Sequence, residues 1–166
     1  MDAALLIARV VFGLLMAAHG AQKLFGWFGG YGLSGTAGFF ESLGFHPGRF
    51  FATAAALSEA GGGLLVALGL FGPAGPALML SVMIVAAVSV HWSHGVFAAS
   101  NGIELPLLYA AGAAALALAG PGTYSVDALL GLSGLWTPAL AWTALALGIL
   151  GAFGNLAARR AVVAAA

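Results

Sequence analysis

The stretch RVVFGLLMAAHGAQKLFG, residues 9–26, decides the fold class. It lies in an apolar run over about 3–25 that is long enough for a membrane-spanning helix, yet it carries charged and polar side chains. In hydrocarbon such side chains are costly and usually face a protein interior or a water-filled cavity. At about 100° per residue, five of its positions fall within an arc of roughly 80°. This stripe, which we expect to face the interior, consists of Arg9, Phe12, Met16, His19 and Lys23.

The composition of the whole chain also indicates an integral membrane protein. Of its 166 residues, 62% are hydrophobic and 6% are charged, and the mean hydropathy is +1.06. A soluble domain has about a quarter charged residues, so this chain has too few to cover a water-facing surface. The formal net charge is zero and no basic run exceeds Arg159-Arg160, which argues against nucleic-acid binding. The absence of cysteine excludes disulfides, thiol catalysis and thiolate metal sites.

Five apolar segments follow one another, and each approaches the roughly 20 residues that cross a bilayer. They run over about 3–25, 50–71, 74–92, 103–119 and 138–158. In lipid the backbone has no water to bond, and the runs are continuous rather than alternating, so these segments are helices. The first begins after Asp2 without a basic region, so we expect it to be retained rather than cleaved as a signal peptide. The predicted fold class is an all-α, polytopic membrane helix bundle.

The connections between the segments predict the topology. The longest, residues 26–49, is glycine-rich and aromatic, and Ser34 suggests the N-cap of a short interfacial helix over 35–43. With five spans, this connection and the C-terminus share one side of the membrane. That side holds Lys23, Arg49, Arg159 and Arg160. The positive-inside rule therefore predicts a cytoplasmic C-terminus and an outside N-terminus.

Small residues predict where the helices touch, because they allow backbones to approach closely. The glycines in question are Gly13, Gly20, Gly61, Gly62, Gly63, Gly148, Gly151 and Gly154.

Successive spans cross the membrane in opposite directions, so the end of each odd-numbered span and the start of the next lie on the same side. This parity of the spans brings six polar side chains to one half of the bundle, whichever side of the membrane that half faces. They are His19, Lys23, Glu59, His91, His94 and Glu104. Glu59 lies in the middle of the second span, where an unpaired carboxylate would be strongly disfavoured. We estimate the depth of each side chain in the membrane from a helical rise of about 1.5 Å per residue. By depth and sign of charge, Arg9 is the preferred partner of Glu59, and His19 is the second choice. A structural ion pair and a proton-handling or ligand-binding carboxylate both remain open.

The histidines of the third span offer several chemistries. His91 and His94 are three residues apart on one helix face, and with Glu104 they offer a metal site as one alternative. We assign no metal, because histidines at a membrane boundary are more often interfacial. His91 alone is a candidate to bind a quinone carbonyl or to donate a proton, and His19 with His91 offers axial haem ligation as a further alternative. Asp127, in a Gly/Pro-rich turn region, is expected to cap or tether a turn.

Five motifs, in this order, resemble a known family. They are HGAQKLFG (19–26), GLSGTAGFFESLG (32–44), ALSEAGGGLLVALGL (56–70), H…G.F…NG.E.PLL (91–108) and GPGTYSVDALLG (120–131). Together they resemble the DoxX family of small membrane proteins. The resemblance implies a four-helix DoxX-like core over 1–131, to which 132–166 would add a fifth transmembrane helix and a basic tail. The recurring polar positions of the family correspond to His19, Lys23, Glu59, His91, Glu104 and Asp127.

The resemblance implies a class of function. The related DoxD subunit belongs to a thiosulfate:quinone oxidoreductase, and other members are linked to oxidative stress. We therefore expect a component of a quinone-linked oxidoreductase in a bacterial or archaeal inner membrane. The residues expected to carry protons are Glu59, His91 and Glu104. Those expected to bind the ligand, a quinone or a small anion, are Arg9, His19, Lys23 and His94.

Two other functions remain open. One is a non-catalytic subunit that docks a soluble oxidoreductase through residues 26–49. The other is a small-molecule transporter, although five spans without an inverted repeat argue against a monomeric one. A homo-oligomer is compatible with each function.

Overall fold

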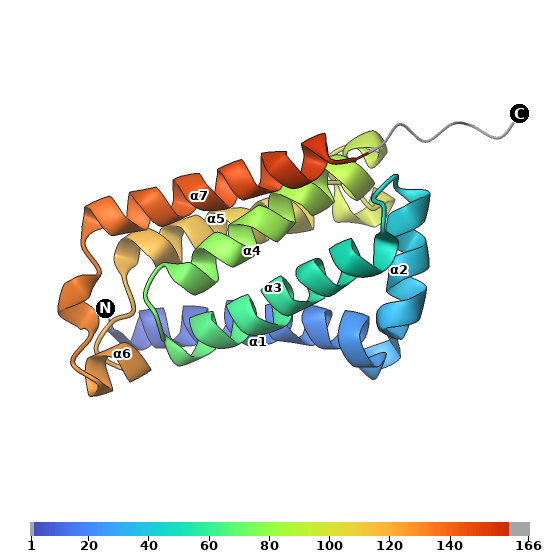
Figure 1. The fold of residues 1–166 in the computed structure, drawn as a ribbon. Helices are drawn as coiled ribbons and strands as arrows, with labels where there is room; N and C mark the ends of the chain where they lie inside the picture. Colours follow the sequence, from blue (N-terminus) through green and yellow to red (C-terminus); the bar gives the residue numbers. More distant parts are fainter. Residues whose placement is uncertain (1, 160–166) are drawn as a thin grey trace, which may run out of the picture.

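The computed structural model describes residues 2–159, and this part of the chain is helix and loop without a strand. Four of its helices are long and apolar enough to cross a membrane. They are α1 (Asp2–Phe25), α3 (Gly48–Leu68), α4 (Ala74–Ala86) with its continuation to His94, and α7 (Pro138–Ala157). The predicted all-α membrane bundle is confirmed (Figure 1). Arg160 and the rest of the predicted basic tail lie outside the described residues.

The fourth predicted span forms a shorter helix. This helix, α5 (Glu104–Ala119), has 16 residues. At about 1.5 Å per residue it is roughly 24 Å long, which is less than the roughly 30 Å of hydrocarbon in a bilayer. The remaining helices are α2 (Gly32–Ser42), α6 (Val126–Leu129), a π-helical segment at Ala87–His91, and 3₁₀ turns at Trp27–Gly29, Trp92–His94, Ala98–Ser100 and Ser133–Leu135.

The α1 and α3 helices approach each other through their backbones. A Cβ atom added to Gly20 would lie 2.3 Å from the nitrogen of Ala60, and one added to Gly63 would lie 2.5 Å from the nitrogen of Ala17. Close packing at small residues was the expectation for these glycines, and it is confirmed. The contacts also set an antiparallel register in which residue 20 is level with residue 60 and residue 17 with residue 63.

Glycines on the other spans behave less uniformly. Gly148 of α7 touches α4, because an added Cβ would lie 2.6 Å from the carbonyl oxygen of Ala77. Gly61 and Gly154 have no neighbour within 4 Å of an added Cβ among the described residues. For these two glycines, the predicted close contact with another helix of the same chain was wrong.

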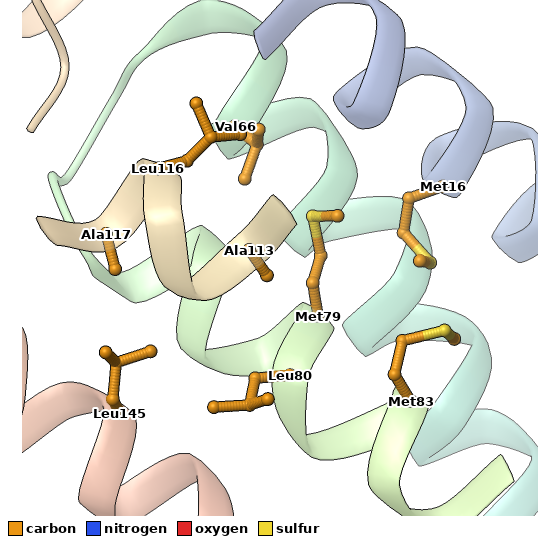
Figure 2. Close-up of a cluster of buried hydrophobic side chains, with 9 residues drawn as sticks. All are labelled: Met16, Val66, Met79, Leu80, Met83, Ala113, Leu116, Ala117 and Leu145. Carbon is orange, nitrogen blue, oxygen red and sulfur yellow. The ribbon is translucent and has the colours of Figure 1, made fainter. Parts of the chain in front are cut away.

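The central helix is α4, which packs against α3, α5 and α7. Around it lies one core of buried side chains (Figure 2). Its members are Met16, Val66, Met79, Leu80, Met83, Ala113, Leu116, Ala117 and Leu145. Because Met16 comes from α1 and Leu145 from α7, the first and last helices share this core.

The α2 helix crosses the ends of α1 and α3 (Figure 1). It begins at Gly32, and the preceding Tyr31 gives it no side-chain cap. Ser34 therefore lies inside the helix, and its prediction as the N-cap was wrong. The connection that contains α2 also shifts α3 along its axis relative to α1. In the antiparallel register described above, residue 25 at the end of α1 is level with residue 55 of α3. Residues 48–54 of α3 thus extend beyond the end of α1.

Candidate functional site

A cavity of about 240 Å³ lies at the end of the bundle where α1 finishes and α3 begins. Three of the residues that span parity assigned to this end line it together. They are Lys23 of α1, Glu59 of α3 and His91 from the π-helical end of α4. Other residues of α3 and α4 form much of the remaining lining, and α2, the loop that follows it and Asn155 of α7 complete it. For these three side chains, the predicted convergence in one half of the bundle is confirmed.

The wall of the cavity is mostly apolar and aromatic, with polar groups set into it. The aromatic side chains are Phe39, Phe40, Phe45 and Phe51. The polar side chains are Lys23, Ser58, Glu59, Ser81, Ser89, His91 and Asn155. A largely apolar pocket with a few polar groups is typical of sites for small organic molecules, which usually occupy about 300–1,000 Å³. The volume here lies just below that range and suits a single ring.

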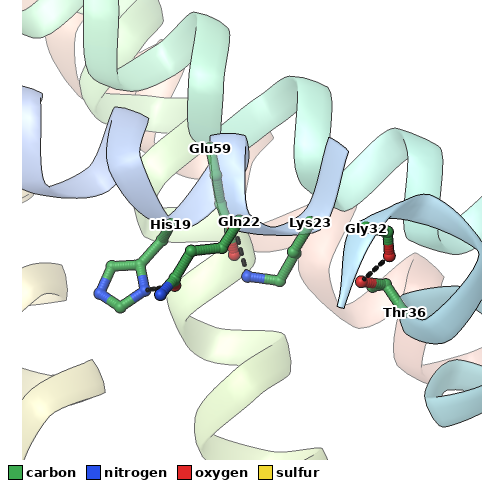
Figure 3. Close-up of polar contacts among 6 residues, drawn as sticks. All are labelled: His19, Gln22, Lys23, Gly32, Thr36 and Glu59. Carbon is green, nitrogen blue, oxygen red and sulfur yellow. Dashed lines mark hydrogen bonds and ion pairs between the residues drawn. The ribbon is translucent and has the colours of Figure 1, made fainter. Parts of the chain in front are cut away.

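Glu59 pairs with Lys23 (Figure 3). The Lys23 ammonium donates to Oε2 of Glu59, whose side chain is 6% exposed. The predicted pairing with Arg9 was wrong, because the estimate of depth started α3 level with the end of α1. In the observed register residue 59 is level with residue 21, two residues from Lys23. Arg9 is then about 18 Å away along the axis, at about 1.5 Å per residue.

The π-helical segment forms one wall of the cavity. Its Ser89 hydroxyl is buried and has no hydrogen-bond partner in the part of the chain that the structure describes. Nδ1 of His91 lies 2.7 Å from the carbonyl oxygen of Asn101. A carbonyl only accepts, so Nδ1 carries the proton, and Nε2 of the neutral ring is an acceptor. Single π-helical turns of this kind are frequent at functional sites.

The C-terminal half of α7 contributes Asn155 to the cavity lining. Nδ2 of Asn155 donates to the carbonyl of Gly151 at 2.8 Å, which leaves Oδ1 for other contacts. One turn further on, Arg159 donates from Nε to the carbonyl of Leu43 and lies 6.0 Å from the centre of the Phe45 ring. These contacts join the end of α7 to the loop between α2 and α3. The predicted fifth span, α7, therefore contributes to the site through Asn155.

His19 does not join the cavity, because α1 is rotated relative to the predicted stripe. The buried residues of α1 are Arg9, Gly13, Met16 and Gly20. Their centre lies about 50° around the helix from the expected stripe, at about 100° per residue. The close approach of α3 at the glycines draws that face inward. His19 is exposed, with Nδ1 3.2 Å from Oε1 of Gln22.

His94 and Glu104 also lie outside the cavity lining. The exposed His94 places Nδ1 3.0 Å from the carbonyl oxygen of Val90. Glu104 accepts the backbone N–H of Ala98 at 2.7 Å through Oε2 and so fixes the turn before α5. Among residues 2–159 no three His, Asp or Glu side chains gather as metal ligands would. The alternative of a metal held by His91, His94 and Glu104 therefore has no support in the geometry.

The opposite end of the bundle holds a second buried polar cluster. Arg9 is 3% exposed and donates from Nη2 to the carbonyl of Tyr124. Asp127 is fully buried and accepts the backbone N–H groups of Phe71 at 3.0 Å and Gly72 at 2.7 Å. The predicted tethering role of Asp127 is confirmed, and it holds the turn between α3 and α4. The cavity beside Arg9 measures about 10 Å³, which is about the space that one water needs.

Sequence reasoning missed Ser89, Asn155 and the aromatic wall. Asn155 is the one amide side chain in the fifth predicted span, and a polar residue at that depth usually faces a protein interior or cavity. That signal was available. Ser89 offered none, because single serines are common at helix contacts in membranes. Only the fold shows that its hydroxyl is left without a partner.

The helices and the cavity define the class, a polytopic membrane bundle with a mostly apolar site between its helices at one end. The protein belongs to the DoxX family, whose model, described as DoxX, matches residues 4–92, more than half of the chain. The matched region contains Lys23, Glu59 and His91 and ends before α5. No curated protein and no solved structure matches the chain.

Proposed function

We propose that this DoxX-family protein binds the head group of a quinone in the cavity between α2, α3, α4 and α7. It would serve as the membrane component of a quinone-linked oxidoreductase. The observation that supports this proposal is the lining, in which four phenylalanines surround a space that also contains buried polar groups. A quinone is a flat apolar ring with carbonyl groups on opposite edges. Aromatic side chains suit the ring faces, and hydrogen-bond donors suit the carbonyls.

Each polar residue of the lining has a chemical role in this proposal. The unpartnered Ser89 hydroxyl would donate to one carbonyl, and Lys23 has ammonium donors beyond the one that Glu59 accepts. Reduction of a quinone takes up two electrons and two protons. Glu59 and His91 are the cavity groups that would exchange the protons, and a partner redox protein would supply the electrons. Glu104 was predicted for the same task, but it begins α5 outside the cavity lining and its carboxylate accepts the backbone N–H of Ala98 instead.

The distribution of basic residues supports an orientation. Lys23, Arg49 and Arg159 lie at the cavity end of the bundle. By the positive-inside rule this end would face the cytoplasm of a bacterial or archaeal cell. The ligand would then exchange protons on the cytoplasmic side.

The proposal is tested by titrating purified protein in lipid nanodiscs with decylubiquinone. We expect saturable binding, and we expect Ala55→Phe, which fills the cavity, to weaken it at least tenfold, as a filled pocket loses most of its contacts. The matched control is Ala146→Phe on the exposed face of α7, which should bind as the parent protein does. Absence of saturable binding, or equal binding by both variants, would refute the proposal.

A second candidate is a membrane subunit that only docks a soluble oxidoreductase. Part of the expected docking loop, residues 26–49, is not available to a partner, since Phe39 and Phe40 line the cavity. Three aromatic side chains near its start are exposed, namely Trp27, Phe28 and Tyr31. A protein that binds no quinone but loses a co-purifying oxidoreductase on Tyr31→Ala substitution would support docking. Flux of small solutes into proteoliposomes would instead support the transporter alternative.

A further inference from the structure

We infer that the cavity binds the reduced, hydroxyl-bearing form of its ring ligand, a hydroquinone, more tightly than the quinone. This inference rests on the proposed function, because it takes a ring of this class as the ligand. The two forms differ in hydrogen bonding. A quinone presents two carbonyls that only accept, whereas a hydroquinone presents two hydroxyls that each donate and accept. The donors and acceptors of the lining therefore decide which form is preferred.

His91 offers an acceptor to the ligand. Its Nδ1 donates to the carbonyl of Asn101 at 2.7 Å, which fixes the tautomer of the neutral ring. Nε2 is then a lone-pair acceptor on a residue that lines the cavity. A hydroxyl can donate to it. A quinone carbonyl cannot, and two facing lone pairs repel each other.

Asn155 offers a second acceptor from a different helix. Its amide nitrogen donates one N–H to the carbonyl of Gly151 at 2.8 Å, so Oδ1 and the second N–H are left for other partners. Asn155 also lines the cavity. With a donor beside its acceptor, Asn155 serves either form of the ring, so the acceptor without a donor beside it is Nε2 of His91.

The other polar groups of the lining do not choose between the two forms. The hydroxyls of Ser58, Ser81 and Ser89 donate or accept as the ligand requires. The paired Lys23 and Glu59 present a donor and an acceptor side by side. The preference for the reduced form is therefore set by His91.

This preference has a redox consequence. When the reduced form binds more tightly than the oxidised form, the bound quinone becomes easier to reduce. For a two-electron couple, a tenfold preference raises the midpoint potential by about 30 mV. The quinone would take two electrons from the partner reductant and two protons that Glu59 and His91 relay from water, and one new hydroxyl would then donate to the deprotonated Nε2 of His91.

The test compares the affinities of decylubiquinone and decylubiquinol for the protein in nanodiscs under anaerobic conditions. We expect the quinol to bind at least fivefold more tightly, in line with one net hydrogen bond. In His91→Asn the shorter amide reaches the position of Nδ1 and keeps a donor for Asn101, while the acceptor at Nε2 is lost. We expect that variant to bind the quinol about fivefold to tenfold more weakly and the quinone within about twofold.

Two further variants keep the test decisive. Asn155→Leu removes a donor and an acceptor together, so it should weaken both forms alike and leave the preference for the quinol in place. His94→Asn, at an exposed histidine outside the cavity, should change neither affinity. Equal affinities for the two forms, or a His91→Asn variant that weakens both alike, would overturn this inference and leave quinone binding standing. Binding of neither form would overturn both.

Discussion

The two ends of this bundle both bury ionic groups, yet only one of them offers room for a ligand. At one end Asp127 is bonded to backbone N–H groups, Arg9 is bonded to a backbone carbonyl, and the adjoining space is about 10 Å³. At the other end Lys23 and Glu59 bond to each other beside a cavity of about 240 Å³. Buried charge alone therefore does not identify a binding site in a membrane protein. The adjoining volume and the nature of the partners do.

The difference in partners has a physical meaning. A carboxylate that satisfies buried backbone amides cannot be spared, since those amides have no water to replace it. A pair such as Lys23 and Glu59 can rearrange around a ligand, because each side chain can form a hydrogen bond to the ligand in place of its bond to the other. The Arg9–Asp127 end should therefore respond to substitution through stability, and the Lys23–Glu59 end through binding.

The largest effect is expected for Asp127→Ala. It removes the fully buried carboxylate that accepts the N–H groups of Phe71 and Gly72 and should lower the free energy of unfolding by about 3–5 kcal/mol. Asp127→Asn keeps one acceptor and should lose less. Denaturant or thermal unfolding of the purified protein in micelles measures both. A change below about 1 kcal/mol for the alanine variant, the scale of an ordinary hydrogen bond, would show that this end is not a structural tether.

A second large effect is expected at Gly69, which the guanidinium of Arg9 contacts. An added Cβ would lie 1.5 Å from Nη1 of Arg9, and the backbone has φ +64°. Gly69→Ala should therefore cost about 2–4 kcal/mol, as backbone strain of about 1–2 kcal/mol adds to the clash.

The matched control for Gly69 is Gly131→Ala. Its φ is +70°, and an added Cβ meets no described atom within 4 Å. Only the strain of about 1–2 kcal/mol then remains. Equal losses at the two glycines would mean that the packing around Arg9 is loose.

A moderate effect is expected for Glu59→Gln at the cavity end. The amide oxygen can still accept from Lys23, so the free energy of unfolding should fall by only about 1 kcal/mol. The affinity for decylubiquinone should fall by about fivefold or more, because Lys23 is no longer held by a full charge. Unfolding and titration of the same preparation give both values. A stability loss as large as that of Asp127→Ala would erase the contrast between the two ends.

The smallest effect on stability is expected for Arg159→Ala. It removes the bond to Leu43 and the contact with the Phe45 ring, which together hold α7 over the cavity. Stability should change by about 1 kcal/mol or less, while the dissociation rate of decylubiquinone rises about fivefold. Stopped-flow measurement of ligand release gives the dissociation rate. The Arg159→Lys variant should release the ligand at a rate between those of the parent protein and the alanine variant. An unchanged dissociation rate would mean that the contacts of Arg159 do not slow the release of the ligand from the cavity.

Much of the site could be predicted from the sequence, although its pairing could not. Lys23, Glu59 and His91 were brought to one end by span parity, which depends only on the number and order of the helices. The partner of Glu59 depended on how far α3 extends past α1, and this offset is set by α2. His19 was assigned to the interior by periodicity, but the glycine contacts with α3 rotate α1 away from that stripe.

Hydropathy and length by themselves determined the class of this protein and the position of its long helices. The reason is that each backbone polar group in hydrocarbon must bond within its own helix, so an apolar run of sufficient length has one solution. Only the tertiary structure decided the axial offset of α3, the rotation of α1 and the contribution of α7 to the cavity lining. These depend on contacts between side chains and backbones of different helices, and the hydropathy of one helix carries no information about them.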